Sequence, residues 1–152
     1  MIKKIIKLLL VLIMMSIIFS FSGENDVKSS SRSDGLIIRT TEILLNRKLT
    51  DKEKELYTEK YVVYVRKTAH FTLYFLLGLF FCSFLKEFDL NNKKLILYTV
   101  LFVFIYACSD EIHQLFVAGR SGEITDVLID TLGGFIASFI YTRFRIRRKL
   151  NG

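Results

Sequence analysis

The sequence predicts an all-α polytopic membrane protein with four transmembrane helices and a short outer amphipathic helix. The first observation behind this prediction is composition: 51% of the 152 residues are hydrophobic and the mean hydropathy is +0.37, which is too apolar for a small soluble domain. The second is distribution, because the charged residues gather at the ends of four apolar stretches and in one polar segment. We expect residues 1–152 to form a single membrane domain.

The first predicted span covers about residues 5–21. It follows the basic sequence Met-Ile-Lys-Lys and contains Lys7, so it also resembles a signal peptide. The Ser-Phe-Ser-Gly sequence at its end is a poor cleavage site, and the apolar run is long. We therefore expect this segment to remain in the protein as a transmembrane helix.

The outer segment, residues 22–60, separates the first two spans. Its opening residues, including Asn25 and the serine cluster at 29–33, are typical of a loop that supplies helix caps. The apolar residues between Leu36 and Leu45 predict a short amphipathic helix that lies on the membrane surface. Thr50-Asp51-Lys52-Glu53 matches a capping box, from which we expect a helix to run into the second span.

The remaining three predicted spans cover about residues 61–85, 95–108 and 125–142. Small residues in the last of these, from Gly133 to Ser138, favour close helix packing. Cys82 and Cys108 lie within apolar runs and show no C-x-x-C spacing, so we expect them to be core residues.

Basic residues flank the predicted spans in three groups, and all three belong on the cytoplasmic side by the positive-inside rule. The groups are Lys3, Lys4 and Lys7; Lys86, Lys93 and Lys94; and Arg143, Arg145, Arg147, Arg148 and Lys149. Both termini are then cytoplasmic, and residues 22–60 and 109–124 face outward. This orientation accounts for the net charge of +7 without a nucleic-acid partner, which we do not predict.

Ionisable and polar residues within the apolar stretches gather near the outer ends of three spans. The second span contains Arg66, Lys67, His70 and Tyr74; the third ends in Asp110, Glu111, His113 and Gln114; the fourth begins with Asp126 and Asp130. A rise of about 1.5 Å per residue places the three groups at similar depth. Arg120 follows Gly119 in a tight turn, which we expect to direct its guanidinium back over this cluster.

Two interpretations of the cluster stay open. The side chains can pair with one another and hold three helices together, because a charged group in a membrane is costly unless it is paired. Alternatively they form an outward-facing polar pocket that binds or modifies a ligand. We favour the pocket, since ionisable groups within a membrane are by default candidates for a functional site.

Several motifs that would name a reaction are absent. His70 and His113 could bind a divalent metal with the carboxylates, but H-E-x-x-H is missing, and we predict neither metal nor cofactor. Asp-Glu-Ile-His at 110–113 matches the sequence of a helicase motif, but the chain lacks the phosphate-binding loop that a helicase needs. A G-x-S-x-G nucleophile elbow is also missing.

Four motifs follow one another in a specific order across the last three spans. They are Arg66-Lys67-x-x-His70-Phe71-x-x-Tyr74-x-x-Leu77-Gly78, Ser109-Asp110-Glu111-Ile112-His113-Gln114-x-Phe116, Gly119-Arg120-Ser121-Gly122 and Asp126-Val127-x-x-Asp130-x-x-Gly133. From about Phe19 to Ser138 the chain thereby resembles the VanZ-like family of bacterial membrane proteins. It departs from the family at Leu73, where a glutamate is common, and at Ala118, where a proline is common. The first departure removes one acid from any mechanism that requires it.

The resemblance implies a multispanning protein of the bacterial cell envelope, and the namesake of the family is associated with low-level resistance to the glycopeptide teicoplanin. It does not supply a reaction. We expect the cluster to bind or handle a membrane lipid, or an anionic lipid or cell-wall precursor, through Arg66, Lys67, His70, Tyr74, Asp110, Glu111, Gln114, Arg120, Asp126 and Asp130.

Two alternatives come from other classes of protein. One is a membrane-embedded enzyme that acts on a phospholipid or polyprenyl phosphate by acid–base chemistry, with His70, His113, Asp110, Glu111 and Asp130 as its candidate catalytic residues. The other is a structural scaffold with a buried ion-pair network.

Overall fold

The computed structural model describes the backbone of residues 1–150 and the side chains of residues 1–144. Within this part of the chain the elements are α1 (Ile2–Ser22), α2 (Asp26–Leu45), α3 (Asp51–Leu85), the 3-10 helix η1 (Lys86–Phe88), α4 (Asn92–Gln114) and α5 (Ile124–Leu150). Four stretches are helical, long and apolar enough to cross a membrane: Ile2–Ser22, Asp51–Phe88, Asn92–Gln114 and Ile124–Phe144. The predicted all-α fold with four spans is confirmed.

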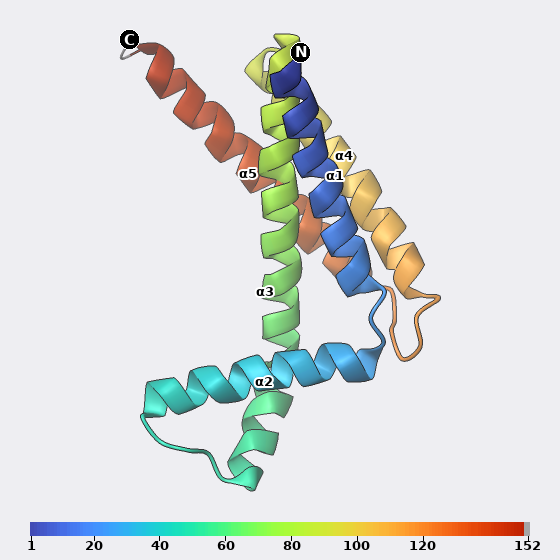
Figure 1. Ribbon diagram of the computed structural model, residues 1–152, viewed down its shortest axis with the longest axis vertical. Helices are drawn as coiled ribbons and strands as arrows, with labels where there is room; N and C mark the ends of the chain where they lie inside the picture. The colour runs from blue at the N-terminus through green and yellow to red at the C-terminus, as the bar shows by residue number, and fades with distance from the viewer. Residues whose placement is uncertain (151–152) are drawn as a thin grey trace.

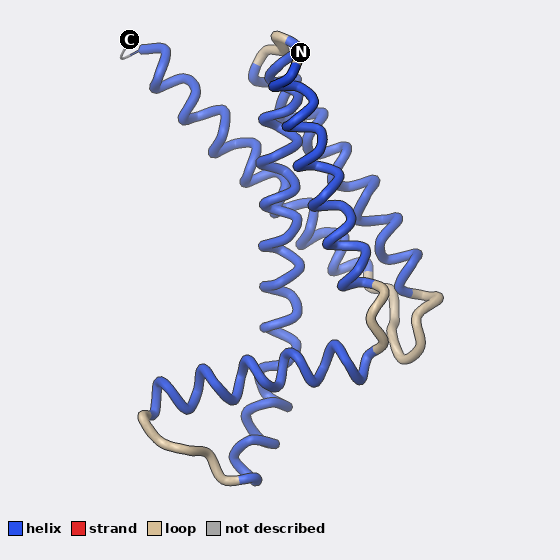
Figure 2. Tube along the Cα trace, viewed as in Figure 1, coloured by secondary structure: helices blue, strands red, loops and turns tan. Residues whose placement is uncertain are grey.

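The four long apolar helices form a bundle, and α2 lies across one end of it (Figure 1). The start of α1, the end of α5 and η1 lie at the opposite end (Figure 1). The connecting loops accordingly gather at the two ends of the bundle, with helix between them (Figure 2). The chain therefore passes from end to end four times, as four successive spans require.

Side-chain caps start three of the helices at polar residues. The Asn25 side chain accepts a hydrogen bond from the backbone N–H of Lys28 at 3.0 Å and starts α2. Thr50 and Glu53 form the predicted capping box at the start of α3. Asn91 caps α4 in the same way as Asn25 caps α2. Polar residues between apolar runs thus decide where the helices begin.

The outer helix α2 is longer than the sequence predicts. The serine cluster at 29–33, which we expected in a loop, lies inside a helix of 20 residues. Two features favour the helix over the loop tendency of serine. Asn25 caps it, and Glu24 pairs with Arg32 at 2.8 Å along the first two turns. The buried side chain of Ile37 then anchors the middle of the helix.

Helix α4 also continues beyond its predicted apolar stretch, to Gln114 instead of Cys108. The additional residues are polar, but Asp110, Glu111 and Gln114 are buried. They face other helices and not lipid, so polarity does not end the helix at this point. This extension carries the third polar group into the bundle.

Close backbone contact between α3 and α5 shapes the centre of the bundle. A Cβ atom added to Gly78 would lie 2.8 Å from the Cα atom of Gly134, and one added to Gly133 would lie 2.8 Å from the carbonyl oxygen of Phe71. Only hydrogen fits at these distances, which confirms the packing role predicted for the small residues of the fourth span. The adjoining core contains the buried side chains of Tyr74 and Val103.

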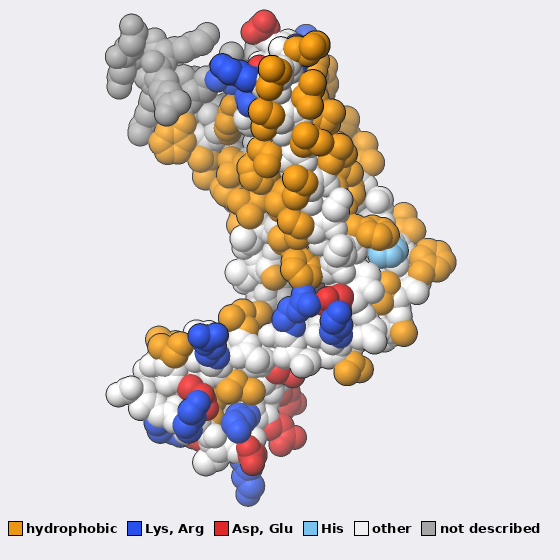
Figure 3. Space-filling view, viewed as in Figure 1, with side chains coloured by type: hydrophobic (Ala, Val, Ile, Leu, Met, Phe, Trp, Pro, Cys, Tyr) orange, Lys and Arg blue, Asp and Glu red, His pale blue; other side chains and the backbone are white. Residues whose placement is uncertain are grey.

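The surface of the bundle is apolar, and the surface around α2 is charged. Figure 3 shows hydrophobic side chains along the visible face of the bundle, with Lys, Arg, Asp and Glu gathered over α2 and the first turns of α3. Lys7, the basic residue within the first span, donates to Glu87 of η1 at 2.5 Å and to the carbonyl oxygen of Ser83 at 3.0 Å. The only cation in the middle of that apolar run therefore has an anionic partner.

Candidate functional site

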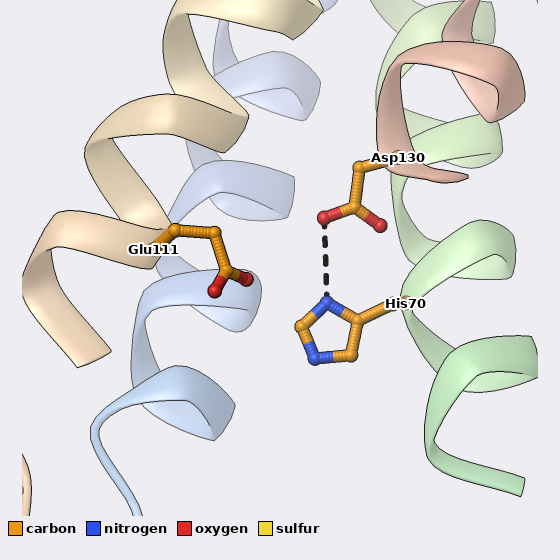
Figure 4. Close-up of side chains that lie close together, drawn as sticks. All are labelled: His70, Glu111 and Asp130. Carbon is orange, nitrogen blue, oxygen red and sulfur yellow. Dashed lines mark hydrogen bonds and ion pairs between the residues drawn. The ribbon is translucent and has the colours of Figure 1, made fainter. Parts of the chain in front are cut away.

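The three polar groups of the sequence converge at the end of the bundle nearest α2. Figure 4 shows the side chains of His70 from α3, Glu111 from α4 and Asp130 from α5, which point toward one another. One potential ligand atom from each lies within 4.8 Å of the other two. Nδ1 of His70 lies 3.3 Å from Oδ2 of Asp130, which joins α3 to α5.

The carboxylates of this centre are removed from solvent. The exposed fraction is 3% for Asp110, 6% for Glu111 and 0% for Asp130. Oδ1 of Asp130 has no hydrogen-bond partner in the described part of the chain, and neither does the hydroxyl of Tyr74, which is also fully buried. Buried polar atoms are normally paired, so two unpaired ones in a single cluster require an explanation.

Gln114 connects the buried carboxylates to the neighbouring segments. Its side-chain nitrogen donates to Oε1 of Glu111 at 3.2 Å and to Oγ of Ser22, at the end of α1, at 2.9 Å. The other oxygen of Glu111 accepts from the backbone N–H of Glu123 at 2.8 Å. The orientation of Glu111 is thereby held from two sides, and α1, α4 and the 115–123 loop meet at this point.

Arg120 folds back over the cluster, as the turn chemistry predicts. Gly119 has a φ of 77°, which favours glycine, and it allows the chain to reverse. The Arg120 guanidinium then donates to Oε1 of Gln114 at 3.1 Å and to Oγ of Ser29 at 2.9 Å. It also donates to the carbonyl oxygens of Phe21 and Glu24. Arg120 thus joins the 115–123 loop to α1, α2 and α4.

The charge of Arg120 has no direct anionic partner. None of the ion pairs in the described part of the chain includes this residue. Partial burial lowers the pKa of the guanidinium, yet such a group stays protonated at neutral pH. A positive charge is therefore held beside the cluster by neutral hydrogen-bond acceptors alone.

The other two predicted cations are held in ion pairs that join helices. Lys67 donates to Asp126 and, at 3.2 Å, to Glu123, so it connects α3 to the start of α5. The hydrogen bond from Lys67 holds the pKa of the Glu123 carboxyl below its usual value. Arg66 donates to Asp26 of α2 at 3.0 Å. These ion pairs fit the interpretation in which the polar side chains pair with one another and hold the helices together.

A cavity of about 820 Å³, here called the α2–α3 cavity, adjoins the buried centre. Its polar lining includes His70, Tyr74, Asp110, Arg66 and Arg120, and its apolar lining includes Ile18, Leu36, Ile37, Leu44, Val65 and Leu73. Leu73 stands where a glutamate is common in the VanZ-like family, so at this position the cavity wall is apolar. The cavity combines a polar region with a long apolar one.

His113, which the sequence analysis grouped with Asp110 and Glu111, lies outside the group formed by His70, Glu111 and Asp130. Its ring stacks on Phe19 of α1, with ring centroids 4.3 Å apart, and it does not line the cavity. The side chain lies about 100° around the helix axis from the face that carries Asp110, Glu111 and Gln114. His113 is close to these residues in the sequence, but its side chain leaves α4 on a different face.

Sequence reasoning missed the residues that the outer segment contributes. Asp26 pairs with Arg66, while Ser22 and Ser29 bond to Gln114 and Arg120. No local pattern identifies them, because their partners lie at least 40 positions away along the chain. The one available signal was the position of Asp26 directly after the helix cap Asn25.

A comparison with known protein families places the segment that contains these residues in one family. Residues 7–145 match the family described as VanZ/LLP1. Among curated proteins and among solved structures, none matches the chain. The family match covers the first apolar stretch from residue 7 onward, the other three in full, the outer helix and every residue of the converged cluster. The chain therefore belongs to the VanZ/LLP1 family.

Proposed function

We propose that this protein binds a membrane amphiphile with an anionic headgroup in the outer leaflet of the bacterial cell membrane, and that this binding affects susceptibility to teicoplanin. The observation that carries the proposal is the α2–α3 cavity, which joins an apolar lining to a polar region that contains Arg66 and Arg120. A lipid or a lipid-linked cell-wall precursor has the same two parts.

The dimensions of the cavity suit part of a lipid. Its volume of about 820 Å³ lies within the range of about 300–1,000 Å³ that is typical of small-molecule sites. Its lining extends along α2 from Ser29 to Leu44, which at about 1.5 Å per residue corresponds to about 22 Å. Arg120 hydrogen-bonds Ser29 at the polar end of this path, and Leu44 lies at the other end.

Charge supports an anionic headgroup. Arg120 has no anionic partner of its own, and Arg66 is only partly satisfied by the half-exposed Asp26. Cationic guanidinium groups whose charge is not fully balanced by a carboxylate favour phosphate and carboxylate ligands when they lie next to a cavity. The positive-inside rule supports the outward orientation, since the basic flanking groups lie at the end of the chain path opposite to α2. Both termini would then be cytoplasmic.

The expected connection to teicoplanin follows from its chemistry. Teicoplanin carries a lipid tail, and it acts where membrane lipids and cell-wall precursors meet. A protein that holds an amphiphile at the outer surface can change how the drug is retained there or how much precursor it encounters. The family resemblance supports this readout, and the cavity supports the molecular class of the ligand.

Native mass spectrometry of the detergent-purified protein tests the binding. We expect phosphatidylglycerol to be retained better than phosphatidylcholine, because only the first has a net negative headgroup. Ala69→Phe should lower this retention at least about fivefold, because Ala69 lines the cavity and the larger ring occupies it. Val63→Phe is the matched control, because Val63 is an exposed residue on the same helix that does not line the cavity.

Two results would contradict the proposal. Equal retention of both lipids would remove the argument from charge, and unchanged retention by Ala69→Phe would show that lipid binds elsewhere on the apolar surface. Arg120→Lys adds a graded test, because lysine keeps the charge but loses the forked geometry of arginine. We expect it to bind phosphatidylglycerol more weakly than the wild type and more strongly than Arg120→Gln.

A second candidate function, a membrane-embedded enzyme, has one specific observation in its favour. His70 and Asp130 form a hydrogen-bonded pair beside the cavity, and such a pair can orient a histidine for proton transfer. The two functions separate in His70→Gln and Asp130→Asn, scored for teicoplanin susceptibility in a sensitive host and for inserted protein. Loss of the phenotype with normal insertion and normal lipid retention favours the enzyme. Loss of lipid retention as well favours binding alone.

A further inference from the structure

We propose that His70, Glu111 and Asp130 form a binding site for one divalent transition-metal ion, Zn²⁺ or Mn²⁺. This assignment stands on the buried centre and does not depend on whether the α2–α3 cavity binds a lipid. It rests on three features of the centre: its charge, the convergence of its ligand atoms, and the unpaired oxygen of Asp130.

The buried centre carries more negative charge than its neighbours neutralise. Asp110, Glu111 and Asp130 are all at least nine-tenths buried. In the described part of the chain the one ion pair that involves any of them is between His70 and Asp130. Lys67 and Arg66 are engaged by other carboxylates, and Arg120 bonds to neutral acceptors. Burial of several carboxylates without matching cations is costly, and a divalent cation removes that cost.

The ligand atoms lie close to the arrangement that a metal requires. A metal at about 2.0–2.2 Å from each ligand holds pairs of ligand atoms no more than about 4.4 Å apart. The three potential ligand atoms here lie within 4.8 Å of one another, and the His70 and Asp130 atoms are already 3.3 Å apart. Small side-chain rotations therefore suffice to complete the coordination.

The donor set narrows the identity of the metal. One imidazole and two carboxylates supply the nitrogen and oxygen donors that Zn²⁺ binds, while carboxylate oxygens also suit Mn²⁺. Ca²⁺ and Mg²⁺ prefer ligand sets made of oxygen alone, and His70 makes them less suitable. Three protein ligands leave coordination positions for water or for a ligand oxygen.

The surroundings have the features of a supported and accessible metal site. Glu111 is held by Gln114 and by the backbone of Glu123, which fixes the direction of its carboxylate. Asp130 points into the group (Figure 4), is fully buried, and leaves Oδ1 without a partner. His70 also lines the α2–α3 cavity, so an ion can reach the site from there. A purely structural contact between His70 and Oδ2 of Asp130 leaves the buried Oδ1 without a partner.

Metal content of the full-length protein tests the assignment. The protein, purified in detergent through a tag without histidine, is stripped with a chelator, exposed to ZnCl₂ or MnCl₂, desalted and analysed by mass spectrometry of the elements. We expect about one ion per chain. Loss of a supporting group alone weakens metal affinity by about 10–100-fold, so His70→Gln and Asp130→Asn should lower the affinity at least about tenfold.

Glu123→Gln is the matched control, because its side chain pairs with Lys67 outside the site while its backbone N–H remains. It should bind metal as the wild type does. The assignment is overturned if the wild type retains neither ion, or if His70→Gln retains as much as the wild type. Should the variants fail to insert, X-ray absorption of the metal-loaded wild type decides. One imidazole and carboxylate oxygens support the site, and a first shell without imidazole overturns it.

Discussion

Replacement of Gly78 by alanine tests how closely α3 and α5 pack, because this contact positions His70 and Asp130 opposite each other. The new Cβ atom would lie 2.8 Å from the Cα atom of Gly134 and 3.2 Å from its carbonyl oxygen. Both are backbone atoms, so the helices themselves must separate. Overpacking of this kind costs about 1–3 kcal/mol, and the higher helix propensity of alanine offsets about 0.5–1 kcal/mol.

The net loss expected for Gly78→Ala is about 1–2 kcal/mol. For a chain of this length that corresponds to a decrease in Tm of about 2–8 °C, since each kcal/mol shifts Tm by about 2–4 °C. Gly35→Ala is the matched control in α2, where the new Cβ atom has nothing within 4 Å. At Gly35 the higher helix propensity of alanine is not offset by any overpacking, so we expect Tm to increase by about 1–4 °C.

Thermal unfolding in detergent measures both variants with a thiol-reactive fluorescent dye in a Cys108→Ser background, where the dye reports the exposure of the buried Cys82. Opposite signs for the two substitutions support the close approach of α3 and α5. If Gly78→Ala is as stable as Gly35→Ala or more stable than the wild type, the helices do not meet at Gly78. The argument that this contact places His70 opposite Asp130 would then fail as well.

Three further predictions concern the ion pairs and the orientation of the chain. A double-mutant cycle with Lys67→Gln and Asp126→Asn should give a coupling of about 0.5–1.5 kcal/mol in unfolding measurements, and additivity would show that this partly exposed pair does not stabilise the protein. The depressed pKa of Glu123 contributes stability above the ordinary glutamate value of 4.5, so the Tm difference between wild type and Glu123→Gln should shrink as the pH falls below it; a constant difference would contradict this. In intact cells, a membrane-impermeant maleimide should label Asp34→Cys but not Lys86→Cys, and the reverse pattern would invert the proposed orientation.

For the residues of the candidate site, the sequence predicts the position along a helix but not the direction of the side chain. The common level of Arg66, Asp110 and Asp130 along the bundle was predictable, because position along a helix converts directly to distance along its axis. The direction in which each side chain points was not. His113 of α4 was grouped with its neighbours by sequence but stacks on Phe19 of α1, while Asp26 was overlooked and pairs with Arg66.

The sequence by itself determined the four spans, the capped start of α3 and the small-residue face of α5, because hydropathy, caps and side-chain size are properties of short segments. Only the tertiary structure decided the length of α2, the α2–α3 cavity and the meeting of His70, Glu111 and Asp130. These depend on how the helices rotate and cross. The rotation and crossing follow from backbone contact at glycines and from hydrogen bonds between residues far apart in the chain, which no local pattern contains.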